Sequence, residues 1–402
     1  MSDPMLSVEE ARDRMLTHAR LTEPDPVPLN EAAGRVPAVA SVVAAVDVPP
    51  FANSSMDGFA LRAADAPGDL RLVGEVAARA AAPSTLLPGT TVRIMTGAPI
   101  PAGADAVVPL EEAEIVGDDR VRLPRTDAGR NVRDRGSDTP RGTQVELAIE
   151  PMTAAKVAVL ASLGMGQIAV RRRPTVAILS TGSELVTPGE ALGAGQIHDA
   201  NGVSLAAAVV EAGGEPILLP RVQDDPAAID EALREGSARA DLLVASGGVS
   251  VGRHDHVRAG IERLGELTFW RIAVQPGKPL AFGSIGERPV IGLPGNPVSA
   301  LVTFELFVRI LLRGMLGMAG DGRQHLPAIL DETVPKDRER RAYLRVIVRP
   351  DGDGWLATPA GGQGSAQLRS MAAANALLVV PEGEAAAEAG ARYDAILLRG
   401  VT

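Results

Sequence analysis

The stretch Gly292-Leu293-Pro294-Gly295-Asn296-Pro297-Val298-Ser299 decides how the chain around it is interpreted. The apolar run at 288–291 predicts a strand that stops at the first glycine, and a helical pattern begins at Val298. Pro297 suits the first helical position, and Asn296 suits the N-cap before it. The stretch therefore predicts a stiff loop that directs bare backbone N–H groups at a helix start, which is a site suited to an anion such as phosphate.

Strand and helix patterns alternate around this loop, from about residue 174 to residue 322. The alternation predicts a mainly parallel sheet covered by helices on both faces, which is an α/β fold. The expected strands are 175–180, 216–220, 241–245, 268–274 and 289–291, and the expected helices lie near 201–212, 226–239, 255–264 and 298–316.

The rest of the chain has other patterns. A capping box opens a helix expected at 7–20, and a second helix is expected at 151–163. Between them, short β-type runs alternate with Gly/Pro turns over about 43–142, which predicts a mostly β domain. From about 323 onward, further β runs indicate a small barrel or sandwich, and the arginine run at 171–173 before Pro174 has the composition of a hinge.

Composition narrows the class of protein. A chain of 402 residues with 46% hydrophobic and 22% charged residues is expected to form two to four globular domains. Cysteine is absent, which excludes thiolate chemistry and is compatible with a cytoplasmic protein. The chain has five histidines and no zinc-binding motif, so a zinc enzyme is not favoured. The net charge of −10 argues against nucleic-acid binding. Charges interrupt the longest apolar stretch, so no membrane span is expected, and no secretory leader is visible.

The stretch 292–299 is one of three polar, glycine-containing loops that follow predicted strands; the other two are 180–185 and 246–252. In parallel α/β sheets, ligands bind at the carboxyl ends of the strands, so the three loops are expected to meet in one binding site. Their hydroxyls, glycines and backbone donors suit phosphate and polar heterocycles. Lys278, one of only three lysines, follows another predicted strand and is interpreted as an anion contact rather than a solvated side chain.

Seven acids are candidates for a Mg²⁺ site, because this ion prefers oxygen ligands. Three of them have a structural alternative that stays open: Asp225 and Asp199 could cap helices, and Asp138 could pair with a neighbouring arginine. Asp57 lies in a polar turn between two phenylalanines, where a ligand role and a turn role are equally compatible with the sequence. The full set is Asp57, Asp138, Glu184, Asp199, Asp224, Asp225 and Asp255.

Taken together, these segments resemble the molybdenum insertases, the family of bacterial MoeA, molybdopterin molybdotransferase and the gephyrin E domain. The motifs occur in the family's order and span most of 1–320, and the last eighty residues match more loosely. The resemblance is carried by residues 50–60, 93–99, 135–138, 180–185, 198–201, 246–252, 276–279 and 292–299.

The resemblance implies four subdomains and a homodimer. A helical subdomain would comprise 1–42 and 143–173, a β-rich subdomain 43–142 would be inserted in it, and a molybdopterin-binding α/β subdomain 174–322 and a β-barrel 323–402 would follow. In this family the β-rich subdomain of one protomer faces the α/β subdomain of the other, so Asp57 and Asp255 would approach each other across the dimer.

The resemblance also implies a Mg²⁺-dependent transferase reaction, in which adenylylated molybdopterin and molybdate give molybdenum cofactor and AMP. By motif position, the implied catalytic residues are Asp57, Thr96, Asp138, Glu184, Asp225 and Asp255, with Glu184, Asp225 and Asp57 at the metal. The implied substrate-binding residues are Gly182, Ser183, Ser246, Gly247, Gly248, Val249, Ser250, Lys278, Pro294, Asn296 and Pro297, and in the C-terminal part Ser365, Arg369 and Ser370.

Some questions stay open at this point. Some relatives have a second lysine where this chain has Gln275, which reduces the local positive charge. The alternatives to the transferase are another α/β enzyme acting on a phosphorylated ligand and a non-enzymatic scaffold related to the gephyrin E domain. Contact with a molybdopterin adenylyltransferase and with apo-molybdoenzymes is compatible with the family. Molybdate and tungstate are oxyanions of near-equal size and charge, so both are compatible with the expected site.

Overall fold

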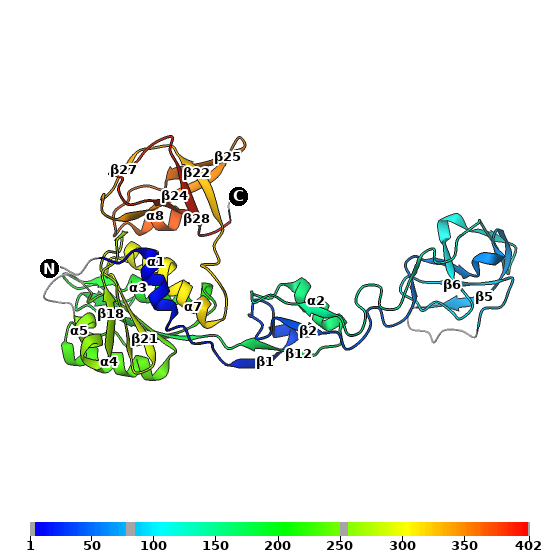
Figure 1. The fold of residues 1–402 in the computed structure, drawn as a ribbon, viewed down its shortest axis with the longest axis horizontal. Coiled ribbons are helices and arrows are strands. Elements are labelled where there is room, and N and C mark those ends of the chain that lie inside the picture. The colour runs from blue at the N-terminus through cyan, green and yellow to red at the C-terminus, as the bar shows by residue number, and fades with distance from the viewer. Residues whose placement is uncertain (1–4, 78–84, 250–255, 401–402) are drawn as a thin grey trace. The chain divides into compact units, whose positions relative to one another are not determined.

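The computed structural model describes residues 5–77, 85–249 and 256–400, which form two compact units (Figure 1). The first unit joins Met1–Pro24 to Arg171–Thr402, and the second unit is Asp25–Val170. One boundary falls at the arginine run where the sequence predicts a hinge. No helix in the described ranges has the length and apolar character needed to cross a bilayer.

A six-stranded sheet forms the centre of the first unit. Five of its strands run in the same direction, and only β20 is antiparallel to its neighbours, which confirms a mainly parallel sheet. The sequence did not predict β20. The strand order is β16 (Glu215–Leu218), β13 (Thr175–Ser180), β17 (Leu242–Ser246), β21 (Arg288–Leu293), β20 (Ala281–Ile285) and β18 (Glu266–Trp270).

Helices cover both faces of this sheet, because alternate residues of its inner strands are buried on opposite sides. Val176 and Ile178 belong to one core, with helices α1 (Val8–Leu16), α3 (Ala200–Glu211), α6 (Pro297–Thr303) and α7 (Arg309–Met315). Ala177 and Leu179 belong to another, with α4 (Pro226–Arg239) and α5 (His256–Leu264). The helix predicted at 298–316 is interrupted by a π-helical turn, Phe304–Val308.

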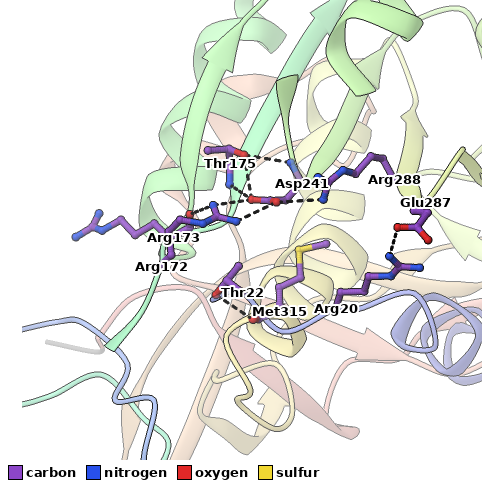
Figure 2. A network of polar contacts seen from close by, with 9 residues as sticks. All are labelled: Arg20, Thr22, Arg172, Arg173, Thr175, Asp241, Glu287, Arg288 and Met315. Atoms are coloured by element: carbon purple, nitrogen blue, oxygen red, sulfur yellow. Dashed lines mark hydrogen bonds and ion pairs between the residues drawn. The ribbon is translucent and has the colours of Figure 1, made fainter. Parts of the chain in front are cut away.

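The amino ends of the strands meet in a network of charges around Asp241 (Figure 2). We call this cluster of Arg172, Thr175, Asp241 and Arg288 the amino-edge network. Asp241 accepts two hydrogen bonds from the Arg172 guanidinium, at 2.8 and 3.0 Å, and one from Arg288 at 3.3 Å. Thr175 donates its backbone N–H and its hydroxyl to the same carboxylate. Burial alone would raise the pKa of Asp241, but these hydrogen bonds outweigh it and leave the pKa below its ordinary value.

The C-terminal part of the first unit is a closed barrel of five strands. Each strand pairs with two others, and pairing between β24 and β26 closes the ring. Apolar side chains from all five strands fill its interior. Around the ring, the strands are β24 (Arg341–Asp351), β25 (Gly354–Pro359), β22 (His325–Leu330), β28 (Arg392–Leu397) and β26 (Ala376–Val380). Helix α8 (Leu368–Ala373) lies between β25 and β26 in the chain.

The second unit contains a six-stranded mixed sheet and the helix α2 (Ala154–Ser162). Helix α2 begins at Ala154, after the N-cap Thr153 and three residues later than predicted, and belongs to a small separate core. The sheet order is β7 (Ala106–Pro109), β4 (Gly58–Leu61), β6 (Thr90–Ile94), β5 (Gly68–Val76), β9 (Arg120–Leu123) and β8 (Glu114–Val116). The β-rich character expected of 43–142 is confirmed.

Candidate functional site

A cavity of about 670 Å³ lies at the carboxyl ends of β13, β17 and β21, and we call it the carboxyl-edge cavity. All three loops predicted from the sequence line it, so the structure brings them together as expected. Its lining comprises Ser180, Thr181, Gly182, Glu184, Leu185, Ile197, Asp199, Asn201, Asp224, Ser246, Gly247, Gly248, Val249, Pro279, Pro294, Gly295, Asn296, Pro297 and Ala366.

The loop after β13 presents a hydroxyl and a carboxylate to this cavity. Thr181 Oγ1 is buried and has no hydrogen-bond partner among the described residues. The Glu184 carboxylate lies against the backbone of Gly182, where a Cβ would be 2.8 Å from Oε2. Any larger residue at position 182 would therefore displace the Glu184 carboxylate. The unpartnered hydroxyl of Thr181 marks a place where a ligand or water can complete the bonding.

The loop after β17 approaches the first loop closely. Gly247 has a φ of +94°, and a Cβ there would lie 2.6 Å from the Thr181 carbonyl oxygen. Gly248 has a φ of +66°, which also favours glycine. Ser246 is only 2% exposed and Val249 is buried. These features fix the backbone of the loop at the edge of the cavity, whereas Ser250, also predicted to bind substrate, lies outside the described residues.

The loop after β21 needs a correction. Asn296 occupies the N-cap position of α6, but its side chain makes no capping bond and instead donates to Ser365 Oγ at 3.0 Å. The Val298 N–H, predicted to be bare, donates to the Ser365 carbonyl oxygen at 3.1 Å. Because Pro297 has no N–H, neither of the first two residues of this helix offers a free donor to an anion. The loop shapes the cavity through Pro294, Gly295 and Pro297 instead.

Two adjacent acids after β16 have different surroundings. Asp225 is the N-cap of α4 and accepts from the Ala228 N–H at 2.8 Å, so its structural alternative is confirmed. Asp224 lines the carboxyl-edge cavity and accepts from the Ser183 N–H at 3.4 Å. The sequence had identified Asp224 as an acid but not as the member of the pair that faces the cavity. Asp199 also caps a helix, accepting from the Gly202 N–H.

No cluster of three or more metal-ligating side chains occurs within residues 5–77, 85–249 and 256–400. Glu184 and Asp224 are the two carboxylates of the cavity lining that neither cap a helix nor form an ion pair among the described residues. Asp255, predicted to be catalytic, lies outside the described ranges.

Lys278 is half-buried and is not one of the described residues that line the cavity. Its positive charge contributes to lowering the pKa of Asp337, after the larger effects of hydrogen bonds from the Glu339 backbone and Arg340. Gln275, which replaces the second lysine of some relatives, accepts a 2.8 Å hydrogen bond from the Asp337 N–H. Gln275 therefore connects its own segment to that of Asp337 within the first unit and contributes no charge.

In the second unit, the structure brings together Asp57 and Thr96, two residues that the resemblance gave separately as catalytic. The Thr96 N–H and hydroxyl both donate to Asp57 Oδ1 at 2.6 Å. Hydrogen bonding from the Thr96 hydroxyl, then from its N–H, and the charge of Arg93 keep the pKa of Asp57 below its ordinary value. Asp57 is thus held ionised in a fixed orientation at the turn between β3 (Asn53–Ser54) and β4.

Asp138 is exposed and accepts only a 3.3 Å hydrogen bond from the Thr139 hydroxyl among the described residues. Its proposed ion pair with a neighbouring arginine is not formed, because Arg135 binds Asp47 at 2.6 Å. The carboxylate is therefore available to solvent.

The C-terminal candidates divide into three roles. Ser365 joins the loop after β21 to the barrel through the two bonds described above. Ser370 is buried, accepts from Arg345 Nε at 3.0 Å and donates to the Gln367 carbonyl oxygen, so it satisfies a buried cation. Burial lowers the pKa of Arg345 to about 10. Arg369 is exposed and lines a second cavity, of about 660 Å³, beside α8.

Comparison with known proteins gives consistent matches along the whole chain. Three family models match in succession: "MoeA N-terminal region (domain I and II)" over 6–164, "Probable molybdopterin binding domain" over 177–314 and "MoeA C-terminal region (domain IV)" over 327–398.

Individual relatives agree with these matches. Molybdopterin molybdenumtransferase 2 of Mycobacterium tuberculosis is 37% identical over 399 residues, which cover 96% of this chain and 98% of that protein. The molybdopterin molybdenumtransferase of Haemophilus influenzae is 34% identical, covering 96% and 97%. A solved structure described as the molybdopterin biosynthesis MoeA protein of Pyrococcus horikoshii superposes with a TM-score of 0.84 at 33% identity, covering 99% of this chain and all of that one.

Proposed function

The chain belongs to the MoeA family of molybdopterin molybdenumtransferases, and we propose that it transfers molybdenum from molybdate to adenylylated molybdopterin, forming molybdenum cofactor and AMP. The observation that carries the proposal is the carboxyl-edge cavity. Its glycine-rich backbone and hydroxyls suit a pyrophosphate-linked ligand, and it lies where α/β sheets bind their ligands. The absence of cysteine is compatible with the reducing cytoplasm, where we place the reaction.

The donors of the cavity fit Mg²⁺, the metal implied by the family resemblance. Glu184 and Asp224 supply carboxylate oxygens, and Mg²⁺ typically uses one or two carboxylates together with waters and substrate phosphates. We assign to Asp224 the metal-binding role that the resemblance gave to Asp225, because the carboxylate of Asp225 caps α4. Bound there, the ion would neutralise charge on the pyrophosphate.

The chain's own residues have three tasks in this proposal. The backbone at 246–249 forms the wall that the phosphates contact, and Gly247 and Gly248 hold it in place because they can pack closely against Thr181 and Val257. The Ser246 and Thr181 hydroxyls direct hydrogen bonds at the ligand. Thr96 holds Asp57 ionised and fixed in orientation. Asp57 is therefore a preorganised negative charge that can orient a positive group, or a proton on an oxygen atom, at the reacting phosphate.

Two further parts of the proposal derive from the resemblance. From the resemblance we retain subdomains 43–142, 174–322 and 323–402. The helical subdomain 1–42 with 143–173 is retained without Met1–Pro24, because that segment and its helix α1 pack in the first unit. We also retain a homodimer in which Asp57 of one subunit serves the cavity of the other. Subunits carrying Asp57→Asn and subunits carrying Gly247→Ala should then regain part of the activity when they are co-expressed as mixed dimers. Mixed dimers as inactive as either parent would contradict this arrangement.

The direct test measures AMP released from adenylylated molybdopterin with and without molybdate. Wild-type protein should release AMP only with molybdate, and Asp57→Asn should lower kcat by about 10²- to 10³-fold, as expected when one preorganised electrostatic group is removed. Asp69→Asn is the matched control, because Asp69 is ion-paired with Arg122 on the sheet of the same unit. The proposal is wrong if the wild type releases no AMP, or if Asp57→Asn releases it as fast as the wild type.

A further inference from the structure

Asn201 joins two of the loops that line the carboxyl-edge cavity. Its side-chain Nδ2 donates to Ser246 Oγ at 2.7 Å and to the Gly295 carbonyl oxygen at 2.8 Å. An amide nitrogen has two hydrogens, so both are used, one for the loop after β17 and one for the loop after β21. Neither bond is a helix cap, because Asp199 caps α3.

The start of α3 holds this amide in a fixed place. Asp199 accepts from the Gly202 N–H at 2.9 Å, and a Cβ at Gly202 would lie 2.9 Å from Ser180 Oγ at the end of β13. The helix start is therefore packed directly on the sheet edge. Asn201 therefore links the ends of β17 and β21, and Gly202 beside it packs against the end of β13.

The direction of the bond to Ser246 has a chemical consequence. An amide N–H can only donate, so Ser246 Oγ must accept from Asn201. The serine hydroxyl then keeps its own hydrogen for a different acceptor. Ser246 lines the cavity and is 2% exposed, so an oxygen atom of a ligand in the cavity is a suitable acceptor for that hydrogen.

We propose that Asn201 is a positioning residue for the ligand: it fixes the spacing of the Ser246 and Gly295 loops and orients Ser246 as a hydrogen-bond donor to an anionic oxygen. This inference rests on the proposed function only for the identity of that oxygen, which would belong to a phosphate of the adenylylated substrate.

The chain offers a matched control for a purely structural role. Asn375 is a buried asparagine in the barrel, and its amide likewise makes two short hydrogen bonds, accepting from the Val348 N–H at 2.7 Å and donating to the Val348 carbonyl oxygen at 2.8 Å. It does not line the carboxyl-edge cavity. Asn375→Ala should therefore lower Tm without changing affinity for a ligand of that cavity.

The test compares Asn201→Asp, Asn201→Ala, Ser246→Ala and Asn375→Ala by calorimetric titration with AMP and by thermal unfolding. An aspartate at position 201 can accept the Ser246 hydrogen and so remove it from the ligand, and its charge repels phosphate. We expect Asn201→Asp to weaken AMP binding at least about tenfold, the effect of losing one hydrogen bond to a charged group. The neutral substitution Asn201→Ala, which removes the bond to Ser246 without adding a charge, should have a much smaller effect in protein that already carries Ser246→Ala.

The inference is overturned if the Asn201 variants lower Tm as Asn375→Ala does but leave the Kd for AMP unchanged, or if the effects of Asn201→Ala and Ser246→Ala on that Kd are simply additive. Asn201→Ala and Ser246→Ala keep the test decisive should Asn201→Asp fail to fold. Failure of the proposed function would look different, because the wild type would then release no AMP whatever the coupling between Asn201 and Ser246.

Discussion

The two ends of the central sheet are built from the same strands but differ in how their polar groups are satisfied. At the amino ends, Asp241 accepts five hydrogen bonds from three residues (Figure 2). At the carboxyl ends, Thr181 Oγ1 lacks a partner among the described residues, and Glu184 forms no ion pair with them. Saturated polar groups stabilise the fold, whereas unsaturated groups on a rigid backbone remain available to a ligand.

The largest expected effect is at the carboxyl edge. Gly247→Ala would place a Cβ 2.6 Å from the Thr181 carbonyl oxygen and require an unfavourable φ of +94°. The loop must move, and a displacement of about 1 Å typically costs about 10²-fold in catalysis. We therefore expect kcat/KM for AMP release to fall by about that factor.

The control for this prediction lies at the other edge. Gly286, in the turn between β20 and β21, also has a positive φ, of +58°, but a Cβ there would meet nothing within 4 Å. Gly286→Ala should lower stability by about 1 kcal/mol through backbone strain and leave kcat/KM unchanged. Equal losses of activity in the two alanine variants would contradict the functional difference between the edges.

The second expected effect is on stability alone. Asp241→Asn removes the charge that Arg172 and Arg288 share, and we expect a loss of about 2–3 kcal/mol in the free energy of unfolding at pH 7, with kcat/KM unchanged. Because the pKa of Asp241 is lowered in the folded protein, its contribution is present above the unfolded pKa of 3.8 and is lost as pH falls through the folded pKa. Urea unfolding at pH 7 and at pH 3 would measure this difference.

A neighbouring, exposed ion pair provides the comparison for the Asp241→Asn measurement. Arg20 and Glu287 pair near the same edge, but their side chains are 63% and 75% exposed. Glu287→Gln should therefore change the free energy of unfolding far less than Asp241→Asn does, because solvent screens an exposed pair. A loss as large as that of Asp241→Asn would mean that burial does not distinguish the two pairs.

The smallest expected effect concerns a polar cluster at the base of the barrel. His325 binds Asp321 at 2.9 Å and Asp394 at 2.8 Å. Burial would lower the pKa of His325, but the two carboxylates outweigh it and raise the pKa above its ordinary value. The protonated ring therefore contributes stability fully below pH 6.5, and that contribution is lost as pH rises through the folded pKa.

Replacing His325 by glutamine should cost on the order of 1 kcal/mol or less at pH 6, because the ring is 42% exposed and the charges are screened. At pH 9 the same substitution should cost almost nothing. Unfolding curves at the two pH values check the prediction, and a cost that rises with pH would refute it.

The sequence predicted much of the first unit because strong local signals mark its elements. The Asp225-Pro226 pair sets the start of α4, and the observed helix has the predicted bounds. Strand β20 was missed because Ala281–Ile285 is short and contains a central glycine. The π-helical turn between α6 and α7 has no recognised signal in the apolar run that forms it.

The site could be predicted at the level of loops but not of single side chains. Which of the adjacent acids Asp224 and Asp225 faces the cavity depends on where the helix starts, since neighbouring side chains point apart. The capping rule for Asn296 failed because Ser365, far away in the sequence, engages this loop: its carbonyl oxygen accepts from the Val298 N–H, which a cap would bond, and its hydroxyl accepts from the Asn296 amide. Asn201 was recognised in a motif, but its bridging role depends on two tertiary contacts.

The most direct test of the account is a crystal structure of the wild-type protein with adenylylated molybdopterin and without molybdate. The account predicts that the pyrophosphate lies in the carboxyl-edge cavity, between the backbone at 246–249 and the loop containing Pro294 and Pro297, with a phosphate oxygen beside Ser246 Oγ. Ligand density elsewhere, for example in the cavity of about 300 Å³ beside the amino-edge network, would contradict it.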